Sequence, residues 1–176
     1  MTAVERLDWK SLPARPCPVA GSLDLFGDRW SILIIRDVMN GVRRFDDLVT
    51  RLGVSRATLS DRLRRLVAAG ILAPAPYQTD GGRSREEYRL TEQGWQLRNV
   101  LIALREWGDR YVLDDEERRL RLVDRDTGHD VRLQLVDAET GEPVEAHRLM
   151  HVITPSPSDG VPTTARTPQV RRRPTR

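Results

Sequence analysis

The sequence predicts an α+β fold, in which short helices precede a two-stranded hairpin, a long amphipathic helix and a small antiparallel β extension. Three observations predict it. Apolar residues recur at every third or fourth position through residues 18–69, which is the period of a helix. Strand-like stretches then flank a glycine-containing turn at residues 78–83. A further helical stretch starts near Thr91, and apolar residues alternate again after residue 119.

Length and composition are those of one ordinary globular domain with a small appendage. The chain has 176 residues, of which 39% are hydrophobic and 31% are charged. No apolar run approaches the roughly 18 residues of a membrane span, and the first residues lack the apolar core of a signal peptide. A single cysteine, Cys17, excludes an internal disulfide and fits a reducing compartment. We therefore expect a cytoplasmic protein without membrane association.

Positive charge is confined to two segments of the chain. Residues 41–90 hold ten arginines and six acids, and the stretch from residue 154 to the end holds five arginines and one aspartate. Residues 91–153, in contrast, hold nine arginines and fourteen acids. A local basic excess is expected where a protein contacts phosphate, although a solvated surface has the same composition.

Residues 53–70 predict a short basic helix with one apolar side. Ser55 is placed to cap its first turn, leucines follow at helical spacing, and Gly70 is placed to end it in the left-handed conformation. The rest of its surface carries the polar residues Arg56, Thr58, Ser60, Arg62, Arg64 and Arg65. Such a helix suits the major groove of DNA, and a solvated basic face is the alternative.

Three helices are predicted before it. Pro18 and Asp28 mark the starts of two of them, which end near residues 27 and 40. A third short helix covers residues 46–52 and is joined to the basic helix through a tight Gly-Val turn. Two short helices joined in this way form a helix-turn-helix pattern.

A β-hairpin is predicted directly after the basic helix. Pro74 and Pro76 restrict its first strand to the edge of a sheet, and Arg83 and Arg85 lie at or near its tip. A hairpin in this position is the wing of a winged helix-turn-helix domain, where arginine enters a minor groove or contacts phosphate. The following helix, over residues 91–111, is apolar on too wide a face for one core. We interpret it as a dimerisation helix.

Five short motifs stand in one order along the chain, and together they resemble the HxlR family of bacterial winged-helix regulators, within the MarR-like group. The motifs are Cys17-Pro18-Val19-Ala20, Gly27-Asp28-Arg29-Trp30, Gly41-Val42-Arg43-Arg44-Phe45, Leu59-Ser60-Asp61-Arg62-Leu63 and Glu87-Tyr88-Arg89-Leu90-Thr91. The resemblance covers roughly residues 17–111. It implies a homodimer that binds a palindromic operator and often responds to oxidants, electrophiles or small metabolites.

Two modes of control are considered. Cys17 stands at a helix start, where the helix dipole and free amides favour a thiolate, and it coincides with the family's N-terminal cysteine, a redox sensor in some members. The alternatives are an inert cysteine, or a small-molecule effector bound near the dimer interface in a pocket lined by Trp30, Trp95 and Trp107. A metal site would have to use His129, His147 and His151, and we expect neither a metal nor a cofactor.

Function divides into three hypotheses. An enzyme is disfavoured because the chain has no phosphate-binding glycine loop, metal-ligand set or nucleophile–base pairing. A winged helix used only for protein contact is disfavoured by the arginines of its basic helix and wing. We therefore expect a sequence-specific transcriptional regulator that binds double-stranded DNA as a homodimer.

The expected DNA contacts fall into groups. Base edges are contacted from the front of the basic helix by Arg56, Thr58 and Arg62. The phosphate backbone is contacted by Arg43, Arg44, Ser55 and Arg65. The wing contributes Arg83 and Arg85, and Ser60 lies on the DNA-binding surface of the helix. The expected domains are a flexible arm over 1–16, the winged-helix and dimerisation domain over 17–112, a β-rich subdomain over 113–153, and a disordered basic tail over 154–176.

Overall fold

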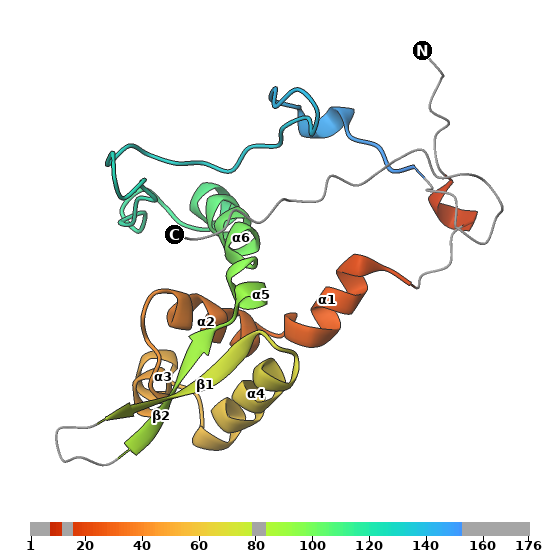
Figure 1. The fold of residues 1–176 in the computed structure, drawn as a ribbon. Coiled ribbons are helices and arrows are strands. Elements are labelled where there is room, and N and C mark those ends of the chain that lie inside the picture. The colour runs from red at the N-terminus through yellow and green to blue at the C-terminus, as the bar shows by residue number, and fades with distance from the viewer. Residues whose placement is uncertain (1–7, 12–15, 79–83, 153–176) are drawn as a thin grey trace, which may run out of the picture. The chain divides into compact units, whose positions relative to one another are not determined.

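The computed structural model of the chain describes residues 8–11, 16–78 and 84–152 (Figure 1). Most of the arm, Arg83 and the tail over 154–176 lie outside the described residues. The chain divides into two compact units, one formed by residues 13–134 and the other by residues 1–12 together with 135–176. The larger unit contains every α-helix and strand of the described residues.

The order of elements confirms the α+β expectation. The larger unit contains α1 (Pro18–Phe26), α2 (Arg29–Met39), α3 (Phe45–Leu52), α4 (Arg56–Ala68), β1 (Leu72–Gln78), β2 (Ser84–Leu90), α5 (Glu92–Trp95) and α6 (Arg98–Tyr111). The smaller unit contains the 3-10 turns η1 (Trp9–Ser11) and η2 (Ala146–Arg148). None of the described helices combines the length and the apolar character needed to cross a membrane.

Helix starts and stops lie where the local sequence predicts them. The Asp28 carboxylate accepts hydrogen bonds from the backbone N–H groups of Trp30 and Ser31, and the Ser55 hydroxyl accepts one from the N–H of Thr58. These bonds satisfy amides that the first turn of a helix leaves without partners. At the other end of α4, Gly70 has φ +69°, the left-handed conformation that ends a helix and favours glycine.

The core lies between α2, α3, α4 and the base of the hairpin. The apolar face of α2 meets the leucine stripe of α4, and α3 closes one side. Its buried apolar residues are Ile34, Ile35, Val38, Leu48, Val54, Leu59, Leu63, Leu66, Ile71 and Leu72. Trp30 packs partly buried against this core.

Strands β1 and β2 pair antiparallel over their full length and form a hairpin that extends away from the helices (Figure 1). The backbone N–H of Thr91 donates to the carbonyl of Ile71 at 3.1 Å. Successive residues of a strand direct their backbone N–H and C=O groups to opposite edges. Because Ile71 faces β2, the nitrogens of Pro74 and Pro76 point to the outer edge of β1. This orientation explains why two prolines are tolerated in the strand, because neither removes a hydrogen bond to β2.

The predicted long helix over 91–111 is divided into α5 and α6. A turn at Gln96 and Leu97 separates the two helices. A Cβ atom at position 94 would lie 2.2 Å from the carbonyl oxygen of Ile71, so Gly94 lets α5 pack directly against the start of β1. The predicted cap is present, since the Thr91 hydroxyl accepts a hydrogen bond from the N–H of Gly94.

Residues 113–153 are predicted to contain three or four strands, but the described part of this range contains isolated antiparallel bridges instead of continuous strands. The bridges join Val123 to Asp130 and Val136 to Pro143. Nearly all apolar side chains of the range are exposed, so their alternation creates no buried face. A strand pair without a buried face is at best marginally stable in water, which accounts for the difference.

Two turns of this range have the same hydrogen-bond scheme. In each, an aspartate (Asp124 or Asp137) accepts backbone N–H bonds from the residues two and three positions later. The N–H three positions later is the main cause that holds the pKa of each aspartate below its ordinary value. Gly128 and Gly141 end the turns with φ +72° and +74°.

Candidate nucleic-acid interface

Helices α3 and α4 form the predicted helix-turn-helix. The turn between them contains Gly53, whose φ of +63° lies in the left-handed region, and Val54, which is buried. The leucines of α4 are fully buried, and the polar residues of the helix point away from them. Of the predicted contacts on α4 and its cap, four are exposed: Ser55, Arg56, Ser60 and Arg65. Thr58 is half-buried, and its hydroxyl lies 2.8 Å from that of Ser55.

Arg56 is the first residue of α4, and its guanidinium group is held from two sides. Its Nη1 donates a hydrogen bond to Oδ1 of Asp46 at 2.7 Å. Its guanidinium carbon also lies 4.8 Å from the centre of the Phe45 ring, within the range of a cation–π contact. Both contacts come from the first turn of α3, so the start of α3 determines where this arginine points.

Arg62 is not part of the exposed surface. Its side chain is 25% exposed, and its Nε lies 3.3 Å from Oδ1 of Asp28, close enough for an ion pair although not aligned as a hydrogen bond. Its Nη1 lies 3.6 Å from Asp61. The structure therefore places Arg62 between α4 and the start of α2, apart from Arg56, and this position disagrees with the expected contact to a base edge.

The hydrogen bonds of Asp28 and its ion pair with Arg62 also shift the pKa of its carboxyl group. Partial burial disfavours its charged form, but the hydrogen bonds from Ser31, the charge of Arg62 and the N–H of Trp30 outweigh it. They hold the pKa of Asp28 below its ordinary value. Asp28 therefore caps α2 as an anion and binds α4 at the same time.

Asp61 pairs with two further arginines of α4. Its carboxylate lies 3.1 Å from Arg64 and 3.1 Å from Arg65, at the i+3 and i+4 positions of the helix. Both arginines are more than 60% exposed, so water screens these pairs strongly. Both are therefore free to exchange the carboxylate for a phosphate.

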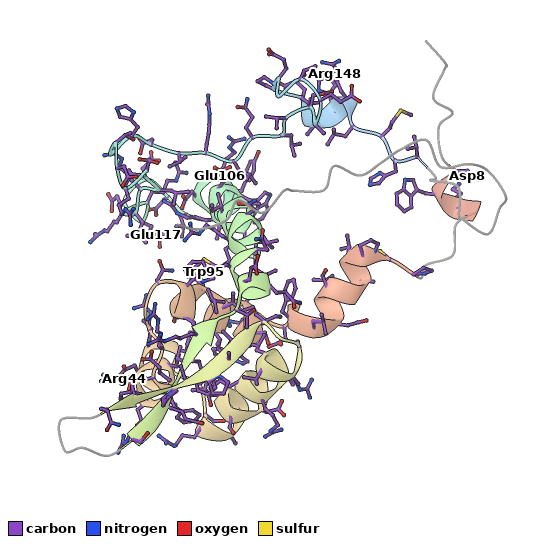
Figure 2. The ribbon with its side chains drawn as sticks, in the orientation of Figure 1. Asp8, Arg44, Trp95, Glu106, Glu117 and Arg148 are labelled. Carbon is purple, nitrogen blue, oxygen red and sulfur yellow. The ribbon has the colours of Figure 1, made fainter. Side chains whose placement is uncertain are left out.

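Arg43 and Arg44 lie beside the hairpin and are part of its base. The carbonyl of Arg43 accepts a hydrogen bond from the N–H of Tyr88 at 2.9 Å, and Arg44 bridges to Glu87. The Arg44 guanidinium carbon lies 4.5 Å from the centre of the Tyr77 ring of β1. This segment thus adds to the outer edge of β2. Arg44 is exposed beside the hairpin (Figure 2), whereas Arg43 is half-buried.

The wing is described on both sides of its tip. Arg85 is exposed, and its Nη1 lies 3.9 Å from Oδ2 of Asp46. The tip itself, with Arg83, lies outside the described residues. The same carboxylate that holds Arg56 is therefore adjacent to the wing, so helix and wing meet at Asp46.

Two helices carry apolar side chains that the described residues leave exposed. Neither α1 nor α6 has a single buried residue. Their exposed apolar residues are Val19, Leu23, Leu25, Val100, Leu104, Trp107 and Tyr111. Cys17 directly precedes α1, is half-buried and makes no capping hydrogen bond with its side chain.

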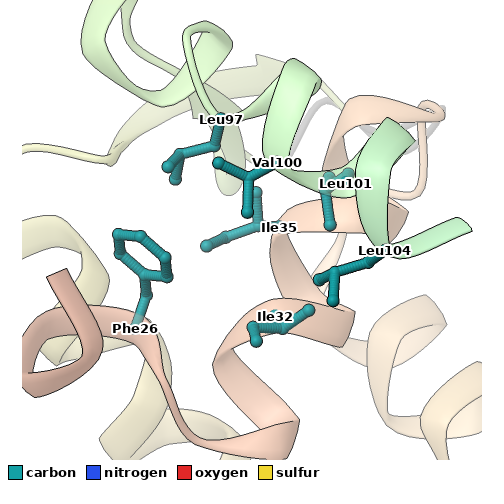
Figure 3. A pocket seen from close by; sticks show the side chains of 7 residues that line it. All are labelled: Phe26, Ile32, Ile35, Leu97, Val100, Leu101 and Leu104. Carbon is teal, nitrogen blue, oxygen red and sulfur yellow. The ribbon is translucent and has the colours of Figure 1, made fainter. Parts of the chain in front are cut away.

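A crevice between α2 and α6 is lined only by apolar residues (Figure 3). Its volume is about 10 Å³, far below that of a ligand pocket. A wider surface hollow is lined by Trp95, Gln96, Arg98 and Asn99. Trp30 and Trp107 line neither, so the three tryptophans of the effector hypothesis do not share either hollow. In the described part of the chain, no three His, Cys, Asp or Glu residues cluster so as to hold a metal.

Sequence reasoning missed the acidic partners of the arginines. Asp46 and Asp28 lie at the starts of other helices, ten or more residues from the arginines they contact. Of these three aspartates, Asp61 is the one whose ion pairs the sequence could have predicted, since it precedes Arg64 and Arg65 by three and four positions of a helix.

Comparison with known proteins decides the family. Residues 25–116 match the model of the HxlR-like helix-turn-helix family. The HTH-type transcriptional regulator Rv3095 of Mycobacterium tuberculosis is 39% identical over 142 residues, which are 81% of this chain and 86% of the relative. The chain belongs to the HxlR-like helix-turn-helix family.

Solved structures agree with this assignment. The transcription factor PA1607 has a TM-score of 0.70 and 39% identity, covering 79% of this chain and 96% of that one. A transcription factor of Pseudomonas aeruginosa, PA1374, has a TM-score of 0.54 and 35% identity, covering 81% and 94%. As an HxlR-like protein, the chain is a DNA-binding transcriptional regulator with a winged helix-turn-helix fold, in which α4 occupies the position of the recognition helix.

Proposed function

We propose that this HxlR-like regulator acts as a homodimer on a palindromic operator, with α4 in the major groove and the β1–β2 wing on the adjacent backbone. One observation carries the proposal. Arg56, Ser60 and Arg65 of α4 are exposed, and Arg85 of the wing approaches the same Asp46 carboxylate that binds Arg56. A helix-turn-helix presents the start of its second helix to base edges, which is where Arg56 stands.

Roles follow from the exposure of each side chain. Arg56, Thr58 and Ser60 are assigned to base edges. Phosphate contacts are assigned to Ser55, Arg65, Arg43, Arg44 and the wing arginines Arg85 and Arg83. Arg62 is assigned a positioning role instead, because its contacts with Asp28 and Asp61 point it away from this surface.

A second copy of the chain is the proposed partner of α1 and α6. Both helices expose large apolar side chains, and an apolar crevice continues between α6 and α2. Apolar surface of this kind marks an interaction site, and a two-fold dimer lets the same face cover itself. The two recognition helices of such a dimer would meet half-sites about one helical turn apart, which requires a palindromic operator.

Control is assigned to Cys17 in preference to a bound metabolite. Cys17 adjoins the α1 surface that the dimer would cover, and its partial exposure leaves the thiol accessible to an electrophile or oxidant. Modification of the thiol would then disturb the dimer. For the small-molecule alternative, the crevice between α2 and α6 is too small, and the hollow of about 440 Å³ beside Trp95 is open to solvent and does not enclose a ligand.

DNA binding is tested with a fluorescent duplex that contains the region directly upstream of the gene, at several salt concentrations. Five phosphate-contacting arginines in each protomer make ten in a dimer, which predicts that log K falls against log salt with a slope of about −9. Absence of binding to any duplex would instead favour a module for protein contact. Repeating the titration with and without reductant tests Cys17: Cys17→Ser should remove any response to a quinone, and an unchanged response in that variant would favour a bound effector.

The dimer is tested by sedimentation of Leu104→Glu. Wild-type protein should sediment at about twice the chain mass of 20.1 kDa, and the variant at the chain mass. Leu120→Glu is the matched control, because Leu120 is 80% exposed but lies outside α1 and α6. Two variants with the same mass as the wild-type dimer would contradict the assignment of this face.

A further inference from the structure

One carboxylate connects the recognition helix with the wing. Oδ1 of Asp46 lies 2.7 Å from Nη1 of Arg56, and Oδ2 of the same group lies 3.9 Å from Nη1 of Arg85. Asp46 is the second residue of α3 and belongs to neither element. An acid placed on a DNA-binding surface repels phosphate, so its presence there needs an explanation other than affinity.

The contacts of Arg56 supply that explanation. An arginine side chain is long, and ordering it on binding costs roughly 0.5–1.5 kcal/mol. Here one edge of the guanidinium is bound by Asp46, and one face lies over the Phe45 ring. Both constraints are present before DNA binds, so part of the ordering cost is already met within the protein.

The remaining donors of Arg56 stay available. A guanidinium carries five N–H groups in a fixed plane. Among the described residues, the hydrogen-bond acceptor of Arg56 is Asp46, which binds only the Nη1 group. The side chain is still 67% exposed. Two donors in a fixed plane match the O6 and N7 acceptors of guanine in the major groove.

We propose that Asp46 is a specificity-determining residue, which orients Arg56 toward a guanine and lowers the affinity for DNA that lacks this guanine. The proposal rests on the proposed function, in which α4 enters the major groove. Asp46 acts in two ways: its geometry improves the contact with the correct base, and its charge disfavours every duplex equally. Only the first effect increases the ratio of specific to non-specific affinity, whereas the second lowers both affinities.

The chain contains a matched control next to this residue. Asp47 lies in the same turn of α3, is exposed and carries the same charge. In the part of the chain that the structure describes, it makes no ion pair with an arginine of α4 or the wing. Asp47→Asn therefore removes the same charge from the same region and leaves Arg56 in place.

The test measures binding to two duplexes of equal length and composition. One duplex is selected by the wild-type protein from a randomised pool, and the other is its scrambled version. We expect Asp46→Asn to lower the affinity ratio about tenfold, the scale of one guanine contact, whereas Asp47→Asn raises both affinities and leaves their ratio unchanged. In an Arg56→Ala background, Asp46→Asn should not change the ratio further.

Asp46→Glu separates geometry from charge. It keeps the carboxylate but displaces it by one methylene, so we expect a lower ratio without a rise in affinity for the scrambled duplex. Thermal unfolding of each variant verifies that the fold is retained; the Asp46 side chain is 61% exposed, so little change is expected. Equal ratios in the wild type, Asp46→Asn and Asp47→Asn would overturn the inference. A wild-type protein that binds both duplexes equally would refute the proposed function itself.

Discussion

Replacement of Arg62 by alanine should reduce stability and leave base preference unchanged. Arg62 is about three-quarters buried and pairs with Asp28 across the α2–α4 contact. An exposed pair contributes at most about 1 kcal/mol, and breaking a fully buried pair costs roughly 3–5 kcal/mol. Because Asp28 is itself 36% exposed, water screens the pair, and we expect a loss of about 2 kcal/mol. In a domain of this size, that loss lowers Tm by roughly 10 °C.

Arg64→Ala is the control for this prediction. Arg64 belongs to the same helix, but its side chain is 71% exposed and pairs only with Asp61 among the described residues. Its replacement should change the free energy of unfolding by no more than about 0.5 kcal/mol. Thermal unfolding gives the stability of each variant, and binding to the selected and scrambled duplexes gives its base preference. If Arg62→Ala retained its Tm but lost base preference, the reasoning from the ion pair would be refuted.

The pH dependence of Arg62→Ala provides a second check. The pKa of Asp28 is lower in the folded protein than its ordinary value of 3.8. A carboxyl group of this kind stabilises the fold fully above its unfolded pKa and loses that contribution as the pH falls through its folded pKa. The stability difference between wild type and Arg62→Ala should therefore be constant near neutral pH and shrink below about pH 4. A difference that grew in acid would contradict the pairing with Asp28.

Three further substitutions test the packing by urea denaturation. Leu63→Ala removes a fully buried side chain of α4 and should cost about 2–5 kcal/mol, and a loss below 1 kcal/mol would show that the site is not core. Gly94→Ala places a methyl group 2.2 Å from the Ile71 carbonyl oxygen and should cost about 1–3 kcal/mol, whereas unchanged stability would show that α5 shifts freely. Ser55→Ala removes the cap of α4 and should cost about 1 kcal/mol; no loss would mean that water replaces the hydroxyl.

The parts of the fold that depend on neighbouring residues could be predicted from the sequence. The caps at Asp28, Ser55 and Thr91 and the leucine stripe of α4 are determined within one or two helical turns, so their residue types identify them. The close packing of Gly94 against the carbonyl of Ile71 was missed because only the tertiary fold brings these two residues together. The strands of the extension were overpredicted because alternation indicates a strand only where one face becomes buried.

The candidate site divides in the same way. Sequence reasoning identified the arginines of α4 and the hairpin, since their helix and wing could be recognised. It could not assign different roles to Arg56 and Arg62, because the roles depend on the acidic partner that each arginine finds on another helix. Asp46 holds one at the surface, and Asp28 holds the other between two helices. Spacing along the chain carries no information on contacts of this kind.

The two prolines of β1 also limit how the molecule can associate. Their nitrogens occupy the outer edge of the hairpin and offer no N–H to an approaching strand. The opposite edge is already bonded at Tyr88 by the carbonyl of Arg43. A second chain that tried to extend this small sheet would find few donors on one side and an occupied position on the other. Growth into sheet-based polymers is thereby suppressed.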